Sequence, residues 1–119
     1  MFKIPKEQSD SIREQTVAGS RRKIMAALCE SLPDVAGTMP ETQLKGVVDR
    51  GIDKADDYGM GSEHGTYCYC AASLLYGESF DQDPNLGWNR EILDDETMDD
   101  DVKSSLIGLR IKMDHGREI

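Results

Sequence analysis

TMPETQLKGVVDRGIDKADDYG, residues 38–59, is the stretch that decides the fold class, because it has the complete pattern of one amphipathic helix. Thr38 and Glu41 have the spacing of a capping box, in which two side chains bond free amides at a helix start. Gly59 suits the left-handed position that commonly ends a helix. Apolar residues recur on one face between these ends, namely Leu44, Val47, Val48, Ile52 and Ala55.

Two glycines interrupt this helix, Gly46 and Gly51. Each costs about 1 kcal/mol relative to alanine unless another helix approaches closely at that position. The helix that follows, from Ser62 as N-cap to Gly77 as stop, is rich in small residues. We therefore expect it to lie centrally, packed on several neighbours, with an inward face of Tyr67, Cys70, Ala71, Leu74 and Leu75.

Three further helices are expected. The first runs from about Glu7 to Leu32, as one kinked helix or two pieces, with an apolar stripe of Ile12, Val17, Ile24, Met25 and Leu28. A short one covers Trp88 to Leu93, and Thr97 caps a last one. The inward face of that last helix is expected to be Val102, Leu106, Leu109 and Met113.

The sequence has no strand-like alternation of useful length. It therefore predicts an all-α protein, a compact bundle of four to five helices. The 119 residues form a single domain, in which residues 1–6 and 114–119 are expected to be loosely ordered.

Charge is unevenly distributed along the chain. Residues 1–30 carry six basic and four acidic side chains, a net of +2, and residues 31–119 carry eight and nineteen, a net of −11. Such a surface repels phosphate backbones and anionic lipids, so we expect neither nucleic acid nor membrane as partner. It suits a basic protein partner, although acidity that serves solubility alone is an equal alternative.

The sequence has no apolar run of signal-peptide or membrane-helix length, so a cytoplasmic location is expected. The three cysteines, Cys29, Cys68 and Cys70, are too few and odd in number for a disulfide framework. Cys68 and Cys70 point about 200° apart on a helix, so we interpret them as small packing residues.

Two candidate sites for chemistry fail on spacing. His64 and Cys68 share a helix face, as a thiol nucleophile or two zinc ligands would, but two more metal ligands are missing. Asp81, Asp83 and Asn85 match the first ligands of a calcium loop, but the required glycine comes one residue late and Ile92 stands where the loop needs its final glutamate. These carboxylates are expected to bond local amides instead. We predict no catalytic residue, no metal and no cofactor.

The segment Asp94–Asp101 holds six carboxylates in eight residues, more than the start of a helix needs. Trp88 is expected to pack inside, but if exposed it would be a strong interface anchor. The predicted partner-binding residues are Phe80, Asp81, Asp83, Trp88, Asp94, Asp95, Glu96, Asp99, Asp100 and Asp101. A plain solvated turn is the alternative for this segment.

The middle of the chain resembles small acidic helical proteins from bacterial gene clusters that encode type VI secretion effectors. The resemblance covers roughly residues 45–110 and rests on Tyr58-Gly59, on the segment from Leu74 to Pro84, and on Trp88 with Glu91–Asp94. It implies an immunity protein that neutralises a secreted toxin, or a chaperone that loads an effector. It carries over no catalytic residues.

These observations give a favoured hypothesis and two alternatives. The favoured one is a non-enzymatic module that binds a toxin or effector with a basic face. The second is a small metal- or thiol-dependent enzyme built on His64, Cys68 and the Asp81–Asp83 loop. The third is a subunit that self-associates as a homodimer through exposed apolar helix faces.

Overall fold

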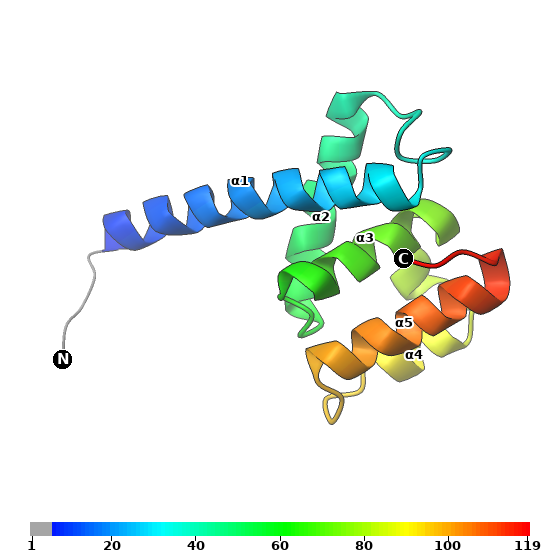
Figure 1. Ribbon diagram of the computed structural model, residues 1–119. Helices are drawn as coiled ribbons and strands as arrows, with labels where there is room; N and C mark the ends of the chain where they lie inside the picture. Colours follow the sequence, from blue (N-terminus) through cyan, green and yellow to red (C-terminus); the bar gives the residue numbers. More distant parts are fainter. Residues whose placement is uncertain (1–5) are drawn as a thin grey trace.

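The computed structural model describes residues 6–119, with side chains within the first helix from Gly19 onward. Over this range the protein is all-helical, as predicted, and forms a single domain without strands (Figure 1). The expectations for Ile12, Val17 and the first five residues fall outside the described positions. The elements are α1 (Lys6–Ser31), α2 (Glu41–Asp57), α3 (Glu63–Tyr76), the 3-10 turn η1 (Phe80–Gln82), α4 (Trp88–Leu93) and α5 (Asp100–His115).

The third helix is the centre of the bundle. It contacts α1, α2, η1 and α5, while α4 packs on η1 and α5 (Figure 1). Its small residues let neighbours approach from several sides, so the prediction of a central helix is confirmed. Tyr69, which was not expected to face inward, is fully buried. Its side chain is the largest among those that are fully buried, and its ring centroid lies 4.9 Å from that of Phe80.

The glycine at position 51 marks the crossing of α2 and α3. A Cβ atom placed there would overlap the Sγ atom of Cys70. At Gly46 a Cβ atom would meet the flexible end of Arg50, 3.1 Å away on the same helix. Of these two glycines, only Gly51 lies where a second helix approaches closely.

Two predicted helix caps are wrong. The N-cap of α2 is Pro40, and the hydroxyl of Thr38 instead donates to the carbonyl of Asp34 at 3.0 Å. The N-cap of α5 is Asp99, since its carboxylate accepts from the amide of Val102, whereas Thr97 bonds to Asp95. In both cases the threonine hydroxyl bonds to a residue of the turn that precedes the helix, so it is not available as a cap. The caps predicted at Ser62, Gly59 and Gly77 are confirmed.

The predicted inward face of α5 is also wrong. Val102, Leu109 and Met113 are exposed by 44%, 52% and 64%, and Leu106 is half-buried. The buried residues of α5 are Lys103, Ser104, Ile107 and Ile111. This helix has two apolar rows, and the second, with Ile107 and Ile111, packs against α3. It fits there because Ser104 is small and because Lys103 buries its aliphatic stem.

Candidate partner-binding surface

Three of the predicted partner-binding residues lie in the core. Phe80, Asp81 and Trp88 are only 1%, 4% and 5% exposed. The rings of Phe80 and Trp88 pack together with Tyr76, which contacts Trp88 edge-on at 5.3 Å. These side chains cannot reach a partner, so the prediction is corrected for them: the aromatic residues of this loop fold inward to complete the core.

Asp81 is held by groups of the same chain. Its carboxylate accepts from the Tyr58 hydroxyl at 2.8 Å and lies 3.5 Å from the ammonium of Lys54. Burial alone would raise the pKa of Asp81, but the hydrogen bonds from Tyr58 and Gln82 and the charge of Lys54 outweigh it, so the pKa is lowered. Asp83 accepts from the amide of Asn85 at 2.9 Å, which is the local turn expected for it.

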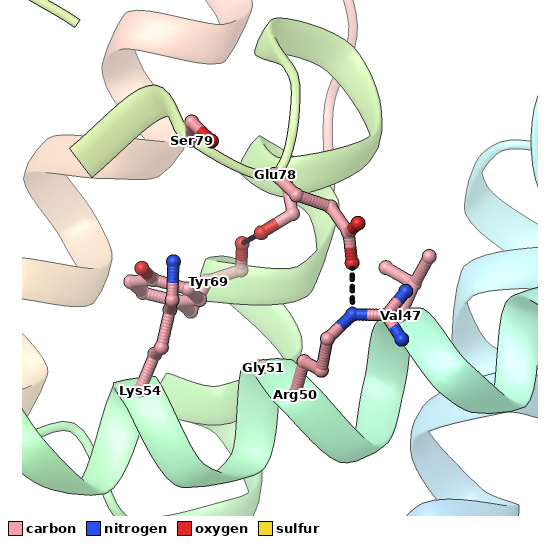
Figure 2. Close-up of a pocket in the computed structure, with 8 residues that line it drawn as sticks. Val47, Arg50, Gly51, Lys54, Tyr69, Glu78 and Ser79 are labelled. Atoms are coloured by element: carbon pink, nitrogen blue, oxygen red, sulfur yellow. Dashed lines mark hydrogen bonds and ion pairs between the residues drawn. The ribbon is translucent and has the colours of Figure 1, made fainter. Parts of the chain in front are cut away.

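A cavity of about 190 Å³ opens between α2 and the start of the α3–η1 loop (Figure 2). Its mouth carries Arg50, paired with Glu78 at 2.8 Å, and Lys54, paired with Asp81. The buried hydroxyl of Tyr69 lines it and has no hydrogen-bond partner among the residues that the structure describes. Because each cation at the mouth has an anion beside it, the cavity presents no net charge to an ionic ligand.

Two carboxylates of the acidic segment shape the turn before α5. Asp94 pairs with Arg90 at 2.7 Å, one helical turn earlier. Asp95 accepts from the amide of Thr97 at 2.8 Å, and the side-chain and backbone hydrogen bonds from Thr97 lower the pKa of Asp95. Both groups therefore have a structural role within the chain.

Two more carboxylates organise the start of α5. Asp99 is the N-cap described above. Asp100 accepts from the backbone amide of Ser62 at 2.9 Å and from the hydroxyl of Ser104 at 3.1 Å, which ties the start of α3 to α5. The remaining carboxylates of the segment, Glu96 and Asp101, are exposed to solvent.

A hollow of the surface adjoins this segment. It measures about 580 Å³ and is rimmed by three exposed carboxylates, those of Asp57, Asp94 and Glu96. Leu93, Met98 and other residues line it further. We call it the acidic hollow. Helices α2 and α4 both end there.

The buried side chain of Lys103 lies at the base of the acidic hollow. Lys103 is 4% exposed, and its ammonium donates to the carbonyls of Tyr58 at 2.6 Å and Leu93 at 2.9 Å. Both carbonyls belong to helix C-termini, which attract a positive charge. Lys103 thus joins α2, α4 and α5 and leaves the carboxylates of the rim facing solvent.

Sequence reasoning missed Asp57 and Lys103. A signal for Asp57 exists, because Asp56 and Asp57 stand at the carboxyl end of a helix, where negative charge is unfavourable. Acidic residues at that end suggest a role other than helix stability. For Lys103 no comparable signal exists, since lysine in a helix is usually exposed.

His64 and Cys68 do share a helix face, with 3.6 Å between Nε2 and Sγ. Cys68 is 2% exposed, and burial raises the pKa of its thiol to about 11. The thiolate that a nucleophile needs is therefore scarce near neutral pH. Within the residues that the structure describes, no three potential metal-ligating side chains come together.

No known protein family, no curated protein and no solved structure matches this chain. Among the helices of the described chain, none is both long enough and apolar enough to cross a bilayer.

Proposed function

We propose that this protein is a non-enzymatic binding domain that receives basic side chains of a protein partner in its acidic hollow. The observation that carries the proposal is the convergence of Asp57, Asp94 and Glu96, which come from two helix ends far apart in sequence. A lysine or arginine of a partner would gain from the carboxylates of Asp57 and Glu96, together with that of Asp94, which it would share with Arg90. The apolar side chains beside them would cover its aliphatic stem.

We further propose that the partner is a secreted bacterial toxin and that this protein is its cytoplasmic immunity protein. The resemblance to proteins of type VI effector clusters supports this role, and so does the net charge of −9. A negative surface speeds encounter with a basic toxin and orients it. Carboxylates can also occupy toxin sites that are built for phosphate groups. A chaperone that escorts the effector would use the same surface.

The test is capture by the purified chain of the products of neighbouring genes, at about 50 mM and about 500 mM salt. The informative variant combines Asp57→Asn and Glu96→Gln, because Asp99 and Asp100 also hold α5 in place and would confound the result. The matched control, Asp53→Asn with Glu91→Gln, removes the same charge from exposed positions outside the hollow.

We expect salt-sensitive capture that falls at least about tenfold in the hollow variant and changes less than about twofold in the control. Equal capture by both variants would exclude the acidic hollow as the binding site. Mixing the captured protein with this chain then separates the two roles. An immunity protein abolishes the activity of the toxin, whereas a chaperone keeps the effector soluble and active.

A further inference from the structure

One face of α5 carries an apolar row without a cover. We call Val102, Leu106, Leu109 and Met113 the α5 stripe. Among the described side chains, three large hydrophobic residues are exposed, and all three belong to it. The helix lies on the outside of the bundle (Figure 1), and within the described chain only Leu106 of the stripe is half-buried. An apolar row of this kind marks a surface that another molecule covers.

The spacing of the α5 stripe is that of a coiled-coil seam. Its members are separated by four, three and four residues, the pattern of the apolar positions along a heptad. This order is the same when the helix is followed from either end. Two copies of α5 in antiparallel orientation would therefore match along the whole stripe. Val102 would face Met113 of the second copy, and Leu106 would face Leu109.

Charges beside the α5 stripe favour the same orientation. Asp101 and Lys112 are exposed, and eleven residues, or about three turns, separate them on one side of the stripe. In an antiparallel pair, Asp101 lies beside Lys112 of the second copy, and the symmetry creates this contact twice. In a parallel pair, the two copies of this side of the helix would lie on opposite sides of the seam, so Asp101 and Lys112 would not meet. The pairing thus satisfies apolar and charged groups together.

Within its own chain, Lys112 pairs with Glu118 at 3.2 Å. The side chains are 62% and 81% exposed, so this ion pair contributes little and leaves Lys112 accessible. Its neighbour along the stripe, Met113, is the most exposed of the large hydrophobic residues. The carboxyl end of α5 is therefore open to contact, as is its amino end at Asp101 and Val102.

We propose that a second copy of this chain covers the α5 stripe, in a two-fold symmetric dimer with antiparallel α5 helices. This surface is separate from the acidic hollow, which stays free to bind another protein. A contact of about three helical turns buries less than the roughly 1,200 Å² of a standard interface, so the dimer is weak and reversible. It forms as concentration rises through the micromolar range.

Sedimentation equilibrium of the purified chain, from about 5 μM to about 1 mM, tests the proposal without any other partner. The wild type should change from monomer to dimer, and Leu109→Glu should weaken the dimer at least about tenfold. Gln43→Glu adds the same charge at an exposed position on α2 and should leave the dimer unchanged. A chain that stays monomeric throughout, or a dimer that Leu109→Glu does not weaken, would overturn the proposal.

Charge reversal tests the antiparallel orientation. D101K and K112D should each dimerise poorly alone, because like charges then meet twice. The double variant D101K/K112D restores opposite charges and should regain dimerisation to within about threefold of wild type. A parallel pair would gain nothing from the double variant, so failure of this rescue in a chain with wild-type circular dichroism overturns the orientation. These measurements do not test the acidic hollow, which the capture experiment tests separately.

Discussion

Lys103 shows how a single residue connects elements that the chain keeps far apart. Its ammonium is buried and lies between the carbonyl groups that end α2 and α4. Those carbonyls have no partner within their own helices, and a cation at a helix end also gains from the dipole. The position therefore requires both the length of lysine and its charge.

We expect Lys103→Met to lower the free energy of unfolding by about 2–3 kcal/mol, because it leaves two carbonyls without a donor. Methionine has a similar volume, so the loss reports the hydrogen bonds rather than a cavity. Urea denaturation followed by circular dichroism measures it. As control, Lys45→Met changes an exposed lysine on α2 and should shift the free energy by less than about 0.5 kcal/mol. An equal effect of both substitutions would contradict the role of Lys103.

At the scale of elements, the crossing of α2 on α3 depends on one missing side chain. Gly51 faces the sulfur atom of Cys70, and a larger residue at position 51 fits only if this side chain or the helix that carries it shifts. The glycine lowers the intrinsic stability of its helix, but it allows the two helices to approach closely. Packing at this crossing outweighs helix propensity.

We expect Gly51→Ala to reduce stability by about 1–2 kcal/mol, since overlap with Cys70 exceeds the gain in helix propensity. Adding Cys70→Ala makes room for the new methyl group, so the two changes together should cost less than the sum of each alone. Gly46→Ala should instead raise stability by up to about 1 kcal/mol. A thermal unfolding series on the four variants decides this, and purely additive effects would speak against the contact.

Helix positions could be predicted well from the sequence, because caps and stops are local signals. Ser62, Gly77 and the bounds of the helix Trp88–Leu93 agree with the structure. The inward face of α5 could not be predicted, since Ile107 and Ile111 form a second row with similar periodicity. Only packing against α3 chooses between the rows. At Thr97, a neighbouring carboxylate competes for the hydroxyl, and a spacing rule does not include that competition.

The candidate site could be predicted only in part. Asp94 and Glu96 were found from their density along the chain, and they do rim the acidic hollow. The residue types of Phe80 and Trp88 also suggest an interface, but large aromatic residues are equally common in cores. Asp57 joins the site through the tertiary fold, which a one-dimensional pattern does not contain.

Across the whole molecule, buried groups that carry protons make stability depend on alkaline pH. Burial raises the pKa of Cys68 to about 11 and that of Cys70 to about 12. Burial also raises the pKa values of Tyr69 and Tyr76. The folded chain holds these protons more tightly than the unfolded chain, so stability is complete below the unfolded thiol pKa of about 8.5. It is lost as pH rises toward the folded values.

We expect each of the two thiols to contribute a loss of up to about 1.4 kcal/mol per pH unit above about pH 9. Urea denaturation in reducing buffer at several pH values between about 7.5 and 10.5 gives the slope. A Cys68→Ala/Cys70→Ala variant should show a shallower slope, whatever its absolute stability. A wild-type curve that stays flat over this range would disprove the prediction.

At the carboxyl end of the chain, the residues after α5 contact the connection between α1 and α2. Arg117 pairs with Asp34, which follows α1, although 83 positions separate them. A fluorescent dye attached at the exposed residue Glu118, next to Arg117, would therefore report on the contact between the chain end and the α1–α2 connection. Energy transfer between that dye and a second one in the α1–α2 connection would be efficient in the native state. It would drop when the contact between Arg117 and Asp34 breaks.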